Sequence, residues 1–322
     1  MKKWMFWIGG LFLLLVVAGG TLFFSIYQTS EDILDASYEE IPRSELEPGP
    51  RTERTPPPQQ ERLNEFPNES FSVLFIGVDD NEHRGEAVSR ADALILATYN
   101  QEDHSARLVR IPRDSYVHVP SIDRQEKIAH AHAFGGVPGT IEAVENLFEI
   151  PIDYYVRLNF HSFVDLVDAI GGVHFDVPYE IVESDSYDQR DAIHLQPGDQ
   201  LLHGEEALAV VRTRKQDSDL ERGERQLDMI QAMTKEMFSL TTLFHLEDLI
   251  QAVGTHLTTN FTPAEIHELF LHHFTHMPTF HFDQLNGTPG HVQGAAVYHI
   301  ETEHQHKLKT ELQHHLGIRS SS

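Results

Sequence analysis

The chain has 322 residues and no cysteine. The absence of cysteine excludes a disulfide framework, a zinc site with cysteine ligands and catalysis by a thiol. It is compatible with a protein that works outside the cytoplasm. The length is sufficient for one large domain with additional segments, or for two small domains.

Basic residues are scarce as well. The sequence has 24 Lys and Arg against 50 Asp and Glu, which gives a formal net charge of -26. Proteins that bind nucleic acid in bulk need a positive footprint, so we expect no nucleic-acid partner. Acidic surfaces of this kind also occur in proteins that must stay soluble at high salt.

Charged residues are absent from residues 4–24. A helix of this length reaches about 31 Å, which matches the hydrocarbon core of a bilayer. Lys2 and Lys3 precede the run and several acidic residues follow it, so the positive-inside rule places the N-terminus in the cytoplasm. A cleaved signal peptide is the alternative, but the run is long for one and has no clear Ala-x-Ala site. We predict that residues 1–27 form a cytoplasmic tip and one transmembrane helix, which anchors an extracytoplasmic protein in the cell membrane.

Residues 28–69 have few aromatic side chains and many acids and prolines, as in EPGPRTERTPPPQQ. This composition cannot bury a core, so we predict an extracytoplasmic linker. Globular character begins at Phe71. We expect one catalytic domain over residues 70–318, with its core at 70–240 and a C-terminal segment at 241–318.

Apolar runs alternate with amphipathic segments in this domain. FSVLFIGVDD, residues 71–80, is almost wholly apolar, which is typical of a strand buried on both faces. Further strands are predicted at residues 91–100, 106–114, 153–159, 172–181 and 207–215. A loop that enters an amphipathic helix is predicted at residues 135–150, and helices are predicted at residues 160–172 and 221–240. The alternation predicts an α/β fold with a mixed central sheet between helices.

Charged side chains gather at the ends of the predicted strands. The first three strands begin or end with Asp79, Asp80, Arg90, Asp92 and Arg113. Ligands of open α/β sheets bind at strand ends, so these residues are candidates for a common site.

Two further groups of polar residues follow. Arg212 and Arg214 are two positions apart, which places them on one face of the predicted strand. Arg222, Arg225 and Gln226 have a spacing that places them on one face of a helix.

The combination of arginines and aspartates predicts a site for a metal-bound diphosphate. Guanidinium groups match phosphate oxygens in a bidentate way. Mg²⁺ usually takes one or two carboxylates together with substrate phosphates. The alternative for each residue is an ordinary surface ion pair, which contributes little to stability.

A series of long motifs carries a resemblance to a known family. In chain order they are LFIGVDD, SRADALILATYN, RLVRIPRDSYVHVP, KIAHAHAFGG, VENLFEIPIDYYVRLNF, LVDAIGGV, LHGEEALAVVRTRKQDSD and RGERQ. They resemble the LytR-CpsA-Psr (LCP) family of membrane-anchored cell-wall proteins over about residues 70–240. The later segment GAAVYHIETEHQHKLKTELQHHLGI is similar to the C-terminal part of the teichoic-acid-transferase branch.

The resemblance implies an Mg²⁺- or Mn²⁺-dependent phosphotransferase. Such an enzyme moves an anionic, teichoic-acid-like glycopolymer from undecaprenyl diphosphate to a peptidoglycan sugar hydroxyl, forming a phosphodiester. The metal-site aspartates of the family fall on Asp79 and Asp92. Its diphosphate-contacting residues fall on Arg90, Arg113, Arg212, Arg214 and Arg222, with Gln226 beside them. We expect Arg90, Asp92 and Arg113 to be catalytic.

Three other charged residues are expected to have different roles. Asp80 stands where the family commonly has Ser, and an extra acid there would alter the affinity or hydration of the metal. Asp114 is expected to support the loop or an arginine, because a carboxylate without metal is repelled by a diphosphate. Arg225 is expected to be a neighbour of the site or an ion-pair partner.

The prenyl chain of the donor needs an apolar slot. An apolar stripe on the helix at residues 160–172 is a candidate lining, although ordinary core packing is the alternative for each member. The stripe consists of Phe160, Phe163, Val164, Val167 and Ile170.

Two other function classes remain open from the sequence. A diphosphatase of lipid-linked sugars would use the same site with water as the nucleophile. A non-catalytic regulator would sense lipid intermediates without turning them over. No segment resembles a DNA-binding motif, which weighs against direct regulation of transcription.

Overall fold

The computed structural model describes residues 38–39, 70–78, 89–213, 219–237, 257–262, 265–266, 268–269 and 278–318. The predicted transmembrane helix and most of the predicted linker lie outside these ranges. Among the described residues, no helix is both long enough and apolar enough to span a bilayer.

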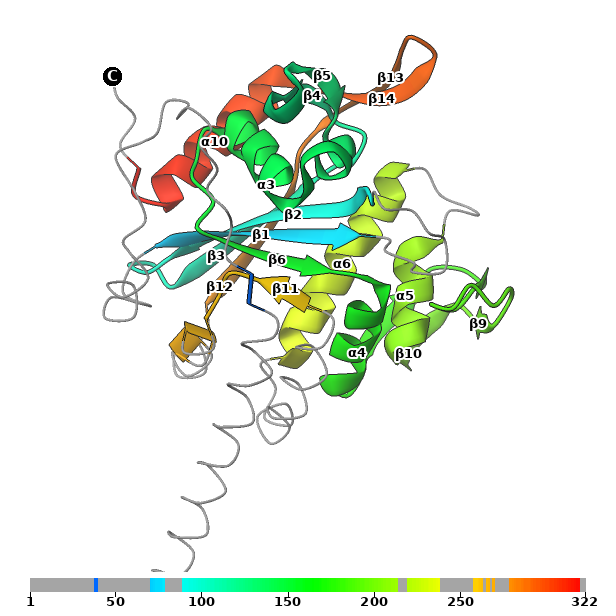
Figure 1. Cartoon of the computed structure of the whole chain (residues 1–322). Helices are drawn as coiled ribbons and strands as arrows, with labels where there is room; N and C mark the ends of the chain where they lie inside the picture. The colour runs from blue at the N-terminus through cyan, green and yellow to red at the C-terminus, as the bar shows by residue number, and fades with distance from the viewer. Residues whose placement is uncertain are drawn as a thin grey trace, which may run out of the picture.

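A six-stranded mixed sheet forms the centre of the molecule (Figure 1). Its strands, in spatial order, are β11 (Leu257–Thr259), β6 (Tyr154–Leu158), β1 (Phe71–Val78), β2 (Ala91–Asn100), β3 (Ser105–Ile111) and β12 (Thr279–Gln284). β2 runs antiparallel to β1 and β3, whereas β6 is parallel to β1 and β12 is parallel to β3. Strands β1, β3, β6 and β12 therefore finish at one end of the sheet, where β2 begins. We call it the carboxyl end.

The first face of the sheet is covered by α3 (Ile128–Phe148) and α10 (Thr302–His315) (Figure 1). The apolar strand side chains at the centre of this face are almost fully buried. Leu74, Ile76, Leu94, Leu96, Val109 and Ile111 are each at most 1% exposed. α3 begins at residue 128, earlier than predicted, and bends at Gly136, which has a φ of 60°. Together these residues form a closed core.

The second face lies toward three other helices (Figure 1). These are α4 (Phe160–Ala169), α5 (Gly204–Arg212) and α6 (Asp219–Met237). They pack mainly on one another and on the two-stranded sheet of β7 (Val173–Val177) and β10 (Gly198–Leu202), around Val167, Leu202 and Met229. A small hairpin of β8 (Ile181–Glu183) and β9 (Ile193–Leu195) lies against α5.

The strand predicted at residues 207–215 is wrong, because residues 204–212 form helix α5. The helix starts with a capping contact in which His203 N donates to the Glu206 carboxylate at 2.9 Å. The apolar run that follows is buried on every side, with Ala207, Leu208, Ala209 and Val210 all in the core. A short apolar run without periodicity fits a buried strand and a buried helix equally well.

Three further segments complete the fold. The hairpin of β4 (Tyr116–Val119) and β5 (Arg124–Lys127) is joined by a 3₁₀ turn at Pro120–Ile122, and the hairpin of β13 (Gly287–Val292) and β14 (Ala295–Ile300) projects from the body (Figure 1). Tyr38 forms a β-bridge with Thr259, so this part of the predicted linker lies on the edge of the sheet. The mixed sheet between helices is confirmed.

Candidate active site

Arg113 and Asp92 meet at the carboxyl end of the sheet. Arg113 lies two residues beyond β3, and its Nη1 donates a hydrogen bond to Oδ1 of Asp92, the second residue of β2. Asp114 Oδ2 is 3.7 Å from Arg113 Nε, and its other oxygen is 2.8 Å from Lys127 Nζ. Asp114 therefore supports Arg113 and Lys127, in agreement with the role expected for it.

The backbone that carries Arg113 is fixed by the start of α3. Ser115 N donates to Pro112 O at 2.9 Å, which closes a tight turn after β3. Ala129 N donates to Arg113 O at 3.0 Å, and Ile128 N donates to Ser115 O at 2.8 Å. Because these bonds hold the main chain, the guanidinium projects from a rigid point at the end of the sheet.

Arg90 follows a residue that is held by a buried histidine. His132 Nδ1 donates to Ser89 O at 2.8 Å, and burial lowers the pKa of His132, which keeps the ring neutral at neutral pH. Arg90 itself is exposed at the entrance to β2. His132 lies in the motif KIAHAHAFGG, but nothing in the sequence indicated that it would contact the segment before β2.

Arg212 lies at the end of α5, next to the start of α4. Its guanidinium carbon is 4.6 Å from the centre of the Phe160 ring, and its Nη1 donates to Asp185 O at 3.2 Å. Its Nη2 is 3.7 Å from Asp188 Oδ1. Because α4 follows β6 directly, this contact brings Arg212 to the same end of the sheet as Arg113. The strand geometry predicted for Arg212 is wrong, and Arg214 lies outside the described residues.

Arg225 closes the end of α5. Its Nε donates to Val210 O at 2.7 Å, its Nη2 donates to Thr213 O at 2.9 Å, and its Nη1 donates to the Tyr179 hydroxyl at 3.1 Å. These bonds satisfy carbonyls that a helix leaves open at its C-terminus. Arg225 is therefore a neighbour of the site with a structural task.

Gln226 joins α6 to the sheet through Arg110. Arg110 Nε donates to Gln226 Oε1 at 3.2 Å, and Gln226 Nε2 donates to Val211 O at 3.2 Å. Arg110 Nη1 donates to Gln284 Oε1 at 2.9 Å. The amide of Gln226 thus orients a buried guanidinium at the carboxyl end.

Arg110 is a residue that sequence reasoning missed. It is only 6% exposed and lies on the second face, where it is paired with Ile95 across β2 and β3. A Cβ atom at Gly223 would lie 2.3 Å from Arg110 Nη1, so α6 approaches the guanidinium with its bare backbone. Arg222, the residue directly before Gly223, is also buried. The available signal was a second arginine, besides Arg107, inside a mainly apolar strand.

The helical stripe proposed for the prenyl chain takes part in packing. Val167 is fully buried in the core of the helical layer, and Phe163 packs against the same core. The Val164 carbonyl would be 2.4 Å from a Cβ at Gly204, which shows how closely α4 and α5 pack. Phe160 lies beneath the guanidinium of Arg212. Core packing, the alternative noted for these residues, accounts for these contacts.

The second face of the sheet offers a larger apolar surface. Strand pairing places Phe75 beside Ile95 and Leu108 beside Phe282 on this face. Phe75 and Ile95 are partly exposed, unlike the apolar side chains next to them on the first face, and Phe282 is partly exposed as well. The strip leads toward Arg110 and the carboxyl end.

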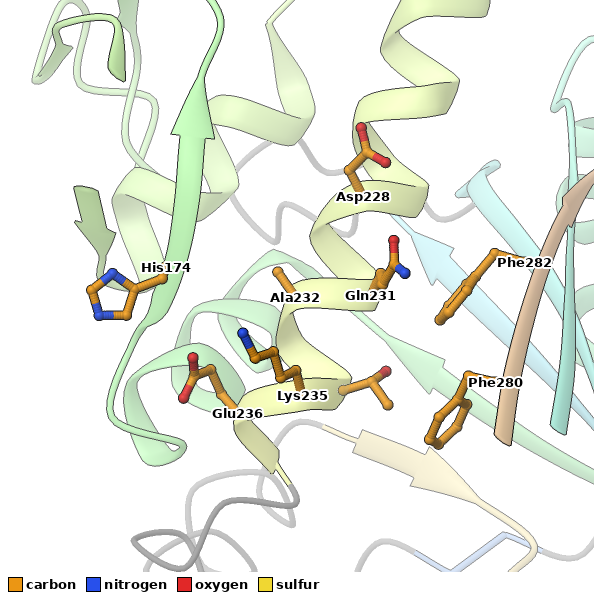
Figure 2. Close-up of a pocket in the computed structure, with 9 residues that line it drawn as sticks. His174, Asp228, Gln231, Ala232, Lys235, Glu236, Phe280 and Phe282 are labelled. Atoms are coloured by element: carbon orange, nitrogen blue, oxygen red, sulfur yellow. The ribbon is translucent and has the colours of Figure 1, made fainter. Parts of the chain in front are cut away.

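A cavity of about 480 Å³ opens between α6 and β12 (Figure 2). Figure 2 shows the rings of Phe280 and Phe282 on the sheet side, facing the helix. The two ring centroids are 6.2 Å apart. The other wall consists of His174, Asp228, Gln231, Ala232, Thr234, Lys235 and Glu236.

Of the two carboxylates predicted to hold a divalent cation, the structure describes only Asp92. Asp92 offers a partly exposed carboxylate beside the last residue pair of β1 and β2, Val78 and Ala91. Asp79 follows Val78 in the sequence but lies, like Asp80, outside the described residues. Within the described ranges, no group of three or more His, Cys, Asp or Glu side chains forms a metal site. Carboxylate oxygens near bound phosphate are ligands that Mg²⁺ accepts.

Comparison with known proteins identifies several relatives. The teichoic acid transferase TagT of Bacillus subtilis, whose full name is polyisoprenyl-teichoic acid–peptidoglycan teichoic acid transferase, is 33% identical over 99% of this chain and 96% of its own. An uncharacterized protein of Staphylococcus aureus, SAOUHSC_00997, is 38% identical over 78% of this chain, but the match spans only 63% of that longer protein.

Solved structures of relatives share the fold. TagT bound to LIIa-WTA superimposes with a TM-score of 0.67 and 35% identity, covering 78% of this chain and 92% of that one. TagT with bound octaprenyl pyrophosphate lipid has a TM-score of 0.62 and 33% identity, with 78% and 91% coverage. The model of the LytR_cpsA_psr family matches residues 22–314. The chain therefore belongs to the LytR-CpsA-Psr family.

Proposed function

We propose that this protein transfers a teichoic-acid-like glycopolymer from undecaprenyl diphosphate to a sugar hydroxyl of peptidoglycan. The observation that carries the proposal is that Arg113, Arg212 and buried Arg110 all lie at one end of a sheet whose second face has partly exposed apolar side chains. A diphosphate suits the arginines, and a prenyl chain suits the apolar strip. The relatives named as teichoic acid transferases support this substrate class.

In this proposal the acceptor hydroxyl attacks the phosphorus that carries the polymer. The bond from this phosphorus to the bridging oxygen breaks, and undecaprenyl phosphate leaves with the electron pair. A carboxylate of the site accepts the hydroxyl proton. Phosphoryl transfer depends mainly on positioning and charge neutralisation, which is the contribution of the arginines.

Asp79 and Asp92 are proposed to hold the divalent cation, Mg²⁺ or Mn²⁺. When bound, the cation supplies positive charge to the diphosphate oxygens. Arg113 has two tasks in this arrangement, because its guanidinium both contacts phosphate and orients Asp92. Arg90, Arg214 and Arg222 are proposed to complete the diphosphate site, and Gln226 orients the guanidinium of Arg110.

The location of the protein is also proposed rather than observed. Residues 1–27 would anchor the chain with its N-terminus in the cytoplasm, and the catalytic domain would then face the cell wall. Recovery of the intact full-length protein in the soluble fraction, rather than with membranes, would overturn this arrangement.

The test incubates full-length protein with a lipid-diphosphate-linked sugar, with and without a peptidoglycan oligomer. We expect a phosphodiester conjugate only when the oligomer and a divalent cation are both present. Release of the sugar phosphate at equal rates with and without oligomer would instead identify a diphosphatase. Tight donor binding without turnover would identify a regulator.

The metal assignment is tested by Asp79→Ala and Asp92→Ala. Each should weaken Mg²⁺-dependent turnover and leave the melting temperature nearly unchanged. For Asp92 the reason is that its partly exposed ion pair with Arg113 contributes little to stability. Full activity of Asp79→Ala at limiting Mg²⁺ would remove that residue from the site.

A further inference from the structure

Tyr187 is the most exposed of the large apolar side chains that the structure describes. It is 68% exposed, compared with 51% for Phe134 and 45% for Leu201. Its ring centroid is 5.1 Å from that of His161, in a tilted arrangement. His161 is the second residue of α4, so the ring lies beside the start of that helix. A large aromatic ring in solvent next to a candidate site offers a face on which a ligand can pack.

The loop that carries Tyr187 is built to hold it in place. The Asp185 carboxylate accepts hydrogen bonds from Tyr187 N at 3.0 Å and from Gln189 N at 2.8 Å. The preceding residue, Ser186, is 3% exposed, and its backbone N donates to the Glu205 carboxylate of α5 at 2.8 Å. The backbone on both sides of the ring is therefore fixed, and a ligand that binds it meets a preorganised surface.

The same loop is joined to the candidate active site through Arg212. This arginine donates to the carbonyl of Asp185 and lies close to the carboxylate of Asp188, and its guanidinium covers Phe160. Phe160 and His161 are adjacent on α4. The Tyr187 ring contacts His161, and the guanidinium of Arg212 covers the adjacent Phe160, so the ring lies near an arginine assigned to the diphosphate.

We propose that Tyr187 binds a pyranose ring of the glycan that enters or leaves this site. The inference rests on the proposed function, because it deepens the description of the same site. A pyranose has one face of C–H bonds, which packs on the negative face of an aromatic ring, and a rim of hydroxyls, which needs polar partners. The loop that carries Tyr187 supplies polar side chains of this kind: Asp185, Asp188, Gln189 and Arg190.

A protein partner fits this surface less well. Stable protein interfaces bury a contiguous apolar centre within about 800 Å² on each side. Here the loop carries one exposed aromatic ring, and the three residues that follow it, Asp188, Gln189 and Arg190, are exposed and polar. One ring with a polar rim matches the size of one sugar unit.

The experiment compares full-length wild-type protein with Tyr187→Ala, Tyr187→Phe and the control Leu201→Ala. Leu201 is another exposed apolar side chain, on β10 of the same layer. Binding of a soluble N-acetylglucosamine oligomer is measured by ligand-observed NMR. The KM for acceptor, the KM for a glycan-bearing donor and kcat are measured separately, together with the melting temperature.

We expect Tyr187→Ala to weaken binding of the oligomer by about five- to tenfold and to raise the acceptor KM by a similar factor, at unchanged kcat and melting temperature. Tyr187→Phe should stay within about twofold of wild type, because it keeps the ring. Leu201→Ala should behave as wild type. A rise confined to the donor KM would support stacking with the glycan of the donor as the occupant.

Wild-type values for the oligomer affinity and both KM values in Tyr187→Ala would overturn the proposal. An early melting transition with a proportional loss of kcat would also overturn it, because the ring would then be structural. If wild-type protein shows no transfer, the proposed function fails. In that case the binding measurement alone decides whether Tyr187 is a glycan contact.

Discussion

The two faces of the central sheet differ in how completely their apolar side chains are buried. On the first face, side chains such as Leu74, Ile76 and Val109 are at most 1% exposed beneath α3 and α10. On the second face, Phe75 and Ile95 come from the same strands but remain partly exposed. Side chains of the two faces alternate along β1 and β2, so the amino-acid composition of the strands does not explain why one face is more exposed.

We propose that this difference separates the residues that stabilise the fold from those that bind a ligand. Alternate residues of a strand point to opposite faces, so one strand contributes to a closed core and to an open apolar strip. The closed face buries its apolar area against its own helices. The open face leaves apolar area for a ligand, and it ends at the arginines of the carboxyl end.

Ile76→Ala should give the largest loss of stability. The side chain is fully buried on the first face, so its removal leaves a cavity and should lower the free energy of unfolding by about 2 to 5 kcal/mol. The turnover per folded molecule should not change. Chemical denaturation and the transfer rate of the same sample check both statements. A stable variant with impaired transfer would contradict the division between the faces.

Acid should lower the free energy of unfolding through the protonation of His315, which packs on the first face. This histidine is buried at the far end of the sheet, where its Nδ1 is 2.8 Å from Thr98 Oγ1 and its Nε2 is 2.9 Å from Ser105 Oγ. Burial, with a smaller contribution from the charge of Arg107, lowers its pKa from 6.5 to about 4. The unfolded chain therefore binds the proton more readily. The contribution of neutral His315 to the free energy of unfolding is fully present above about pH 6.5. It is lost as the pH falls toward 4, and the loss is about 3 kcal/mol at most.

The comparison that isolates this effect uses His315→Gln. Wild type and variant are unfolded with urea between pH 4 and pH 8. The difference between their two stability curves should shrink as the pH falls from 6.5 to 4. A difference that is constant across this range would show that His315 does not titrate with folding.

Phe282→Ala should have the smallest effect on stability and a selective effect on the donor. The ring is partly exposed on the second face and lines the cavity beside α6 (Figure 2). We expect a stability loss near 1 kcal/mol, because the site is already open to solvent. The donor KM should rise for a long prenyl chain but not for a short one. Equal effects on both chain lengths would place the chain elsewhere.

Much of the fold was predictable because its strands are apolar runs with clear boundaries. β1, β2, β3, β6 and α4 lie within a few residues of their predicted positions. The helix α5 was mistaken for a strand because ALAVV is apolar on every side and carries no period. Register along the sheet and the helix contacts depend on partners far away in the chain, and local patterns do not contain that information.

The candidate site was predictable in its residue types but not in its contacts. Arg113 and Asp92 were assigned from strand ends and from the family motifs, and the structure brings them together. Arg110 was missed because its partners come from α6 and β12, which are remote in sequence. Arg225 has a task at the end of α5 that spacing on a helix did not reveal. The assigned roles of these residues in catalysis are predictions.

The central claim is that the arginines of the carboxyl end bind a diphosphate, and Arg113→Lys tests it most directly. Lys keeps the charge but cannot form two parallel hydrogen bonds to phosphate, which should cost about 1.5 to 3 kcal/mol in the transition state. The measurement is the pair of melting temperature and transfer rate. Our account predicts an unchanged melting temperature and a rate lower by about one to two orders of magnitude. An unchanged rate, or a loss of activity in proportion to a lower melting temperature, would contradict it.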